Sequence, residues 1–136
     1  MEEKKDINVE ALAKLISLTR NDKLSWTSVD PSEVFNRSPE DIISSVFVTH
    51  YKDKVLRIYQ RKYKGPSIGA KLGAIFSSSI SSGEMRWYTE VVLELINDEG
   101  HSLWSFPKEE ILKDLLEVIK YKVSGASDLI NSLLSD

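Results

Sequence analysis

Two arginines and two tyrosines alternate along one stretch of the chain, and their side chains are well suited to binding an anionic ligand. The four residues are Arg57, Tyr59, Arg61 and Tyr63. Arginine pairs with phosphate, and a neighbouring aromatic ring can stack on a nucleobase. Because side chains alternate along a strand, the four would share one face of a sheet. We therefore predict a nucleic-acid- or nucleotide-binding face here, with Lys71 and Tyr88 as further candidate binding residues.

The simpler interpretation of the same row is charge pairing inside the sheet. Residues 45–71 carry seven basic side chains and one acidic one, whereas the segments on both sides are net acidic. Opposite charges on neighbouring strands are an ordinary way to pair strands, and Glu90 and Glu94 would supply them. The net charge of −3 and the pI of about 5.5 also weigh against extended tracking of phosphates. The sequence leaves both interpretations open.

Other chemistries have little support in the residues. The chain has no cysteine, which excludes disulfides, thiolate catalysis and cysteine-ligated metal centres. The two histidines, His50 and His101, each lie beside a predicted turn and match no metal-ligand spacing. No nucleophile-elbow motif is present. We therefore expect no catalytic residues, no metal and no cofactor.

The first helix is predicted over residues 9–20, with Asn8 as its N-cap. A short strand or extended arm follows, anchored in the core by Trp26. Ser38, Pro39 and Asp41 resemble a helix start, which predicts one or two helical turns after them.

Two β-hairpins should form the sheet. The first covers residues 45–63 and turns at Lys52 and Asp53; the second joins residues 85–96 to a return strand through a turn ending at Gly100. In the second hairpin Trp87 is expected on the buried face with Val91 and Leu93, and Trp104 is also expected in the core. The alternative is one partly exposed tryptophan beside Tyr88 that anchors a partner.

Two helices complete the predicted fold. An apolar stripe predicts a helix over residues 108–123 that ends at Gly125, and a short helix follows. Its apolar residues either dock on the domain or form a stripe for homodimerisation; they are Ile130, Leu133 and Leu134. The fold class is therefore α+β, with an antiparallel sheet of about four strands and helices from both ends of the chain on one face.

A segment rich in glycine and serine interrupts the two hairpins. Residues 64–84 read KGPSIGAKLGAIFSSSISSGE. Gly65, Gly69 and Gly73 recur around Lys71, but the Gly-Lys-Ser/Thr ending of a phosphate loop is missing. We predict a flexible insertion within one domain of residues 1–136, either a loop ordered by a partner or a simple mobile insertion.

Parts of the chain resemble a group of small uncharacterised bacterial proteins. The matching stretches are LISLTRNDKLSWTSV, WYTEVVLELINDEGHSLWSFP and DLLEVIKYKVSGASDLINSLL, about half the chain. Proteins similar to this are often encoded among mobile-element genes. The resemblance implies a regulatory or defence-related accessory protein, and it transfers no catalytic residue.

Together these features favour a non-catalytic, protein-binding regulatory or inhibitory factor, immunity-like in character. The alternative is a nucleic-acid- or nucleotide-binding module that uses the Arg/Tyr face. The expected partner is another protein; a homodimer and a nucleic acid are the alternatives, and a membrane is not expected. Because the N-terminus lacks the apolar core of a signal peptide and no run is long enough to span a membrane, we expect a cytoplasmic location.

Overall fold

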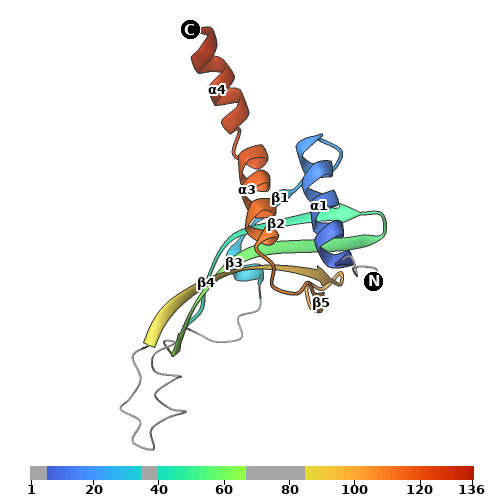
Figure 1. Ribbon diagram of the computed structural model, residues 1–136, viewed down its shortest axis with the longest axis vertical. Helices are drawn as coiled ribbons and strands as arrows, with labels where there is room; N and C mark the ends of the chain where they lie inside the picture. Colours follow the sequence, from blue (N-terminus) through green and yellow to red (C-terminus); the bar gives the residue numbers. More distant parts are fainter. Residues whose placement is uncertain (1–5, 35–39, 67–84) are drawn as a thin grey trace, which may run out of the picture.

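The computed structural model describes residues 6–34, 40–66 and 85–136 (Figure 1). They form an α+β fold in which five antiparallel strands follow one another across the sheet in chain order, β1-β2-β3-β4-β5. The strands are β1 (Thr27–Val29), β2 (Ile42–Tyr51), β3 (Lys54–Pro66), β4 (Met85–Ile96) and β5 (Ser102–Ser105). The α+β class and both hairpins are thus confirmed, with one strand more than predicted.

The additional strand is the arm that follows the first helix. β1 pairs with β2 so that Ser28 lies opposite Phe47. Trp26, just before β1, is buried, and its indole N–H donates a hydrogen bond of 3.0 Å to Thr19 Oγ1. The predicted anchoring role of Trp26 is confirmed, because burying an indole requires a partner for its N–H.

Two helices cover one face of the sheet. They are α1 (Ile7–Arg20) and α3 (Ile111–Val123), which pack against each other and against β2, β3 and β4. Asp6, rather than Asn8, caps α1: its carboxylate accepts a hydrogen bond of 3.0 Å from the Asn8 N–H. The main core lies between these helices and the sheet, with Leu12, Ile58, Leu93, Leu115 and Ile119 at its centre.

A smaller apolar cluster lies on the opposite face. Val34, which follows the short 3₁₀ helix Pro31–Glu33, packs there with Val46 and Tyr59, and all three are buried. A β-bulge makes this possible. The register shifts between Ser44 and Phe47, and Ser45 adopts a φ of 53°. With the bulge, Ile43 packs in the second cluster while Phe47 lies in the main core.

The prediction of one or two helical turns after Ser38 and Pro39 is wrong from Ile42 onward, where the chain forms a strand. Those two residues lie outside the described part of the chain, but β2 begins at Ile42, directly after Asp41. The ladder with β3, which pairs Ile42 with Lys62 and Ile43 with Arg61, outweighs the local helix signal at these positions. Tertiary pairing commonly overrides a weak local propensity.

Two of the three tryptophans are not in the core. Trp87 is 45% exposed and Trp104 is 48% exposed, which corrects the prediction for both. β3 and β4 extend past the helices as a two-stranded ribbon (Figure 1), so no helix covers Trp87. Trp104 lies on the short edge strand β5, where its ring packs edge-on against Phe106 at 4.8 Å between centroids.

Residues 64–66, which the prediction assigned to the insertion, belong to β3. Residues 67–84, with Lys71, lie outside the described residues.

The last helix, α4 (Ala126–Ser135), stands clear of the sheet and of α1 (Figure 1). Gly125, before it, has a φ of 76°, as the predicted helix end requires. The apolar residues of α4 are exposed, so they do not dock on the described part of the domain.

Candidate functional site

Arg57 is not available to an external anion. Its side chain is buried, 4% exposed, and Nε donates a hydrogen bond of 2.8 Å to Glu94 Oε1. Nη1 donates another, of 3.0 Å, to the carbonyl of Gly100 in the β4–β5 turn. Glu94 is directly opposite Arg57 in the β3–β4 ladder and is itself buried. The prediction that Arg57 lines an exposed binding face is therefore wrong, and the charge-pairing interpretation is confirmed at this position.

Tyr59 is buried as well, at 6% exposure, in the cluster with Val34 and Val46. The segment after β1 folds over this face of the sheet and covers the inner half of the predicted row. Tyr59 is therefore a core residue, and it cannot present its ring to a nucleobase.

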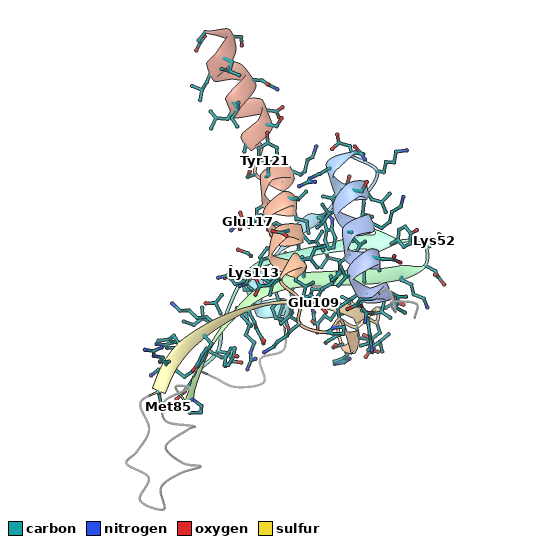
Figure 2. The ribbon with its side chains drawn as sticks, in the orientation of Figure 1. Lys52, Met85, Glu109, Lys113, Glu117 and Tyr121 are labelled. Atoms are coloured by element: carbon teal, nitrogen blue, oxygen red, sulfur yellow. The ribbon has the colours of Figure 1, made fainter. Side chains whose placement is uncertain are left out.

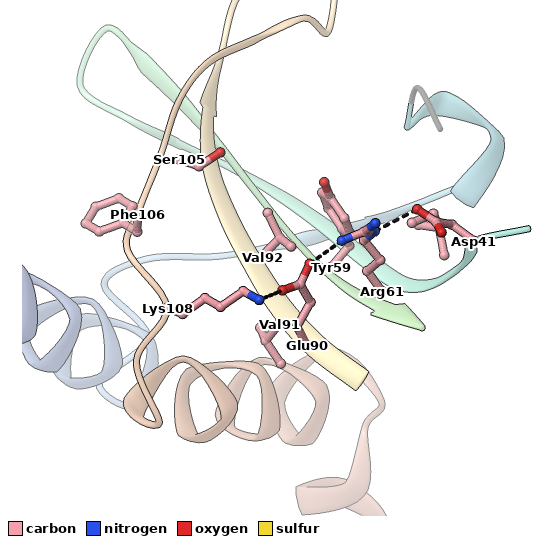
Figure 3. A pocket seen from close by; sticks show the side chains of 10 residues that line it. Asp41, Tyr59, Arg61, Glu90, Val91, Val92, Ser105, Phe106 and Lys108 are labelled. Atoms are coloured by element: carbon pink, nitrogen blue, oxygen red, sulfur yellow. Dashed lines mark hydrogen bonds and ion pairs between the residues drawn. The ribbon is translucent and has the colours of Figure 1, made fainter. Parts of the chain in front are cut away.

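Arg61 lies further along β3 and is partly exposed. Its Nε donates to Asp41 Oδ2 and its Nη1 to Glu90 Oε1, each at 2.7 Å. On the other side of Glu90, Lys108 Nζ lies 2.6 Å from Oε2, which has no other hydrogen-bond partner among the described residues. Asp41, Arg61, Glu90 and Lys108 thus form one continuous chain of opposite charges (Figure 3).

These pairings keep Arg61, Glu90 and Lys108 ionised. Burial alone would raise the pKa of Glu90, but the hydrogen bonds and positive charges of Lys108 and Arg61 outweigh it, so that pKa is lowered. The hydrogen bond to Glu90 raises the pKa of Lys108, and partial burial offsets it only in part. Burial also opposes charge on Arg61, but its two carboxylate partners raise its pKa on balance. A group held charged in this way is poorly suited to exchanging protons near neutral pH.

The same charges line a small cavity, shown in Figure 3. Its volume is about 150 Å³, and its walls include Tyr59, Val92, Ser105 and Phe106 beside the charged groups. This is small beside the roughly 300–1,000 Å³ of typical ligand pockets. Its charged side chains already hold one another, so the cavity presents no unpaired cation to a phosphate.

The outer residues of the predicted set have a different environment. Tyr63 is half-buried: its ring stacks on Tyr88 at 5.7 Å between centroids, and the Arg61 guanidinium lies 4.4 Å from the ring centre. The Tyr88 hydroxyl donates a hydrogen bond of 2.7 Å to the carbonyl of Pro66. Tyr63 and Tyr88 therefore stiffen the end of the β3–β4 hairpin, where they form an aromatic pair.

We call residues 62–66 and 85–89 the distal ribbon. Figure 2 shows this ribbon extending beyond α3, with Met85 at its end. Its exposed cations are Lys62, Lys64 and Arg86, and none of them forms an ion pair with a carboxylate of the described residues. Trp87 and Met85, 45% and 58% exposed, provide apolar surface. The ribbon is thus both basic and apolar.

Trp87 lies between two lysines of the neighbouring strand. Lys64 is directly opposite it in the ladder, with Nζ 5.1 Å from the ring centre, and Lys62 Nζ lies 5.7 Å away. Sequence reasoning favoured the core for Trp87, with a partly exposed tryptophan beside Tyr88 as the alternative, and it did not identify the two lysines beside the ring. The alternation of side chains along β3 could have shown this. Lys62 and Lys64 lie on the face opposite Tyr63, which is also the face of Trp87.

One edge of β4 is open along the ribbon. β5 pairs only with Glu94–Ile96, and the Phe106 N–H donates to the Leu93 carbonyl at 2.8 Å. Leu93 thus directs its backbone groups toward this edge, and in an antiparallel ladder every second residue does the same. Trp87 and Thr89 therefore present N–H and C=O groups there, and no described strand pairs with them.

Comparison of the chain with protein-family models, with curated proteins and with solved structures finds no match. Within residues 6–34, 40–66 and 85–136 there is no cluster of three or more side chains suited to hold a metal ion. No helix among these residues has the length and apolar content needed to cross a membrane.

Proposed function

We propose that this chain is a non-catalytic protein-binding factor of a regulatory or inhibitory kind, which holds an extended acidic segment of a partner protein along the distal ribbon. The observation that carries the proposal is the combination found there: an exposed tryptophan, a β4 edge that no described strand covers, and three cations with no carboxylate partner among the described residues. Adding a strand to an open edge is a recurrent mode of peptide recognition, in which the backbone supplies affinity and the side chains supply selectivity.

The residue types favour a protein as the partner. Tryptophan, methionine and arginine are enriched in protein–protein interfaces, and Trp87, Met85 and Arg86 are consecutive in the chain here. Because successive side chains point to opposite faces, a bound strand would place alternate residues beside Trp87 and Lys64. Acidic or apolar side chains fit those positions.

The ionised groups at the base of the ribbon support a non-catalytic role. Glu90, Arg61 and Lys108 neutralise one another, and their pKa shifts hold each in its charged form. They fix the shape of the ribbon's base rather than offer a reactive group.

A direct test uses a probe that can add a strand. We expect a fluorescein-labelled octapeptide of alternating valine and glutamate to bind the full chain, and an alternating valine and lysine peptide not to bind. Thr89→Pro removes one outward N–H without changing charge, and edge strands tolerate proline at such positions. It should weaken binding at least tenfold with little change in thermal stability, whereas Thr89→Val, the matched control, should bind normally. Equal binding by Thr89→Pro and wild type would exclude strand addition.

A second candidate function is binding of single-stranded nucleic acid on the same ribbon. The observation that favours it is the pair of lysines beside the exposed ring of Trp87, since stacking and phosphate pairing together bind single strands. Glu109 and Glu110, which line the pocket between the ribbon and the start of α3, repel phosphates and carboxylates alike, so they do not separate the two functions.

The two functions are distinguishable by their response to Thr89→Pro. A fluorescein-labelled twelve-nucleotide thymidine strand should bind through Trp87, Lys62 and Lys64, and it should not need hydrogen bonds to the backbone of β4. Under this function, Thr89→Pro leaves the anisotropy change intact, Lys62→Glu with Lys64→Glu abolishes it, and the affinity falls steeply between 50 and 200 mM salt. No binding at low salt rejects it.

A further inference from the structure

The C-terminal helix has an apolar face with no partner among the described residues. Leu129, Ile130, Leu133 and Leu134 are 61%, 44%, 64% and 79% exposed and occupy one side of α4. A helix of ten residues is marginal in water unless its apolar side packs against something. We therefore expect this apolar face to pack against another surface.

The domain also has an apolar groove that no described segment of the chain fills. It lies on the helical face of the sheet, on the side where α1 meets β5 and the β2–β3 turn, and its volume is about 370 Å³. Leu56 and Leu95 line it from the sheet, Leu15 and Leu18 from α1, and Trp104 and Phe106 from β5 and the segment after it. No residue of α3 lines it, so the groove is a vacant place for a further helix beside α1.

The charges of the two surfaces are complementary. α4 carries Asp128 and, at its C-cap, Asp136, and it has no basic residue. The charged residues that line the groove are Lys14 and Lys54, and none of its lining residues is acidic. A helix with acidic residues at both ends would thus meet lysines when its leucines enter the groove.

The groove is out of reach of the α4 of the same chain. α3 has 13 residues, so its end at α4 lies about 20 Å along the helix axis from its start. α4 continues away from the sheet beyond α3 (Figure 1). If α4 folded back at Gly125, it would run along α3, which does not line the groove.

We propose that α4 of one copy lies in the groove of a second copy, and that the exchange is reciprocal. Each copy then contributes one helix and one groove, which closes a two-fold dimer with two identical contacts. This dimer leaves the distal ribbon open, because the groove lies near the turn that carries Lys52 and the ribbon ends at Met85, at opposite ends of the sheet (Figure 2). The inference does not depend on the proposed function of the ribbon.

The test compares a helix variant with a groove variant by sedimentation equilibrium of the full chain. Leu133→Asp with Leu134→Asp changes only exposed side chains, and Ala11→Glu with Lys14→Glu places like charge opposite the acidic helix. We expect wild type to be a dimer and each variant to be a monomer at the same concentration, with dissociation constants raised at least tenfold. Leu103→Asp and Ala13→Glu alter exposed residues that do not line the groove, and both should remain dimeric.

Mixing the two variants gives the decisive result. The helix variant keeps an intact groove and the groove variant keeps an intact helix, so the mixture can form one of the two contacts. We expect a heterodimer that neither variant forms with itself. A wild-type monomer would overturn the proposal. So would a groove variant that remains dimeric, since that result would indicate direct pairing of α4 with α4.

Discussion

The inner and outer parts of the β3–β4 hairpin both carry basic and aromatic residues, but Arg57 in the inner part and the lysines of the outer part lie on opposite faces of the sheet and in opposite environments. In the inner part, Arg57 is paired with Glu94 and buried. In the outer part, Lys62 and Lys64 lie beside the exposed ring of Trp87, and neither lysine forms an ion pair with a carboxylate of the described residues. The difference comes from what covers each part: the segment around Val34 packs over the inner part, and the helices end before the outer one. Alternation determines which side chains share a face, and the covering elements determine whether that face meets solvent.

The largest expected effect is at the inner pair. Glu94→Leu leaves the buried Arg57 guanidinium with the Gly100 carbonyl as its only hydrogen-bond acceptor among the described residues, and we expect a loss of about 3–5 kcal/mol in the free energy of unfolding. Arg57→Met combined with Glu94→Leu removes both charges and should recover most of that loss. Urea denaturation of both variants measures the difference.

If the double variant is as unstable as Glu94→Leu alone, the cost comes from the shape of the site rather than from an uncompensated charge. The comparison between a buried inner pair and solvated outer cations would then rest on packing alone.

A smaller effect is expected at Glu90, at the boundary between the two parts. Glu90→Gln loses charge-assisted contacts with Arg61 and Lys108, and we expect about 1–2 kcal/mol at pH 7. The folded-state pKa of Glu90 lies below its usual value, so its carboxylate stabilises the fold above the unfolded-state pKa. That contribution is lost as the pH falls through the folded-state pKa. Glu90→Gln and wild type should therefore converge in stability at low pH.

The converse holds for Lys108 at high pH. Its pKa is raised in the folded state, so its contribution is complete below the unfolded-state pKa and is lost as the pH rises through the folded-state pKa.

A stability difference between Glu90→Gln and wild type that stays constant from pH 7 to pH 3 would show that this charge chain does not stabilise the fold.

The smallest effect on stability is expected on the distal ribbon. Lys62→Gln with Lys64→Gln removes two solvated charges, and we expect a change within about 0.5 kcal/mol. Thermal unfolding measures it, and Trp87 fluorescence reports whether the ribbon keeps its structure. A loss above 1 kcal/mol would mean that these lysines hold the ribbon together, so that its two parts differ less than their exposure indicates.

Much of the fold was predictable because it follows local periodicity and turn chemistry. The strand over residues 85–96, the turn at Lys52 and the positive φ of Gly100 all follow from residue type and spacing. The apolar stripe of α3 was equally clear, since Leu112, Leu115 and Ile119 recur at helical spacing and are all buried.

The candidate site was less predictable, because it depends on which segments pack over each face of the sheet. Arg57 and Tyr59 were correctly placed on one face, but nothing periodic in residues 30–34 indicates that Val34 will pack over that face. The bulge at Ser45 carries no glycine to mark it. Trp87 was assigned to the core because tryptophans usually are buried, and only the extent of the helical layer shows otherwise.

The order of the strands has a consequence for how the chain folds. Every strand pairs with its neighbour in sequence, so the sheet can form progressively from strands that are adjacent in the chain. The packing of α1 on α3 differs, because it joins residues about a hundred positions apart. During synthesis, Leu12 and Ile16 emerge before Leu115 and Ile119 and cannot be buried fully until those residues have been made. The main core is thus completed only when α3 packs on α1, which was made about a hundred residues earlier.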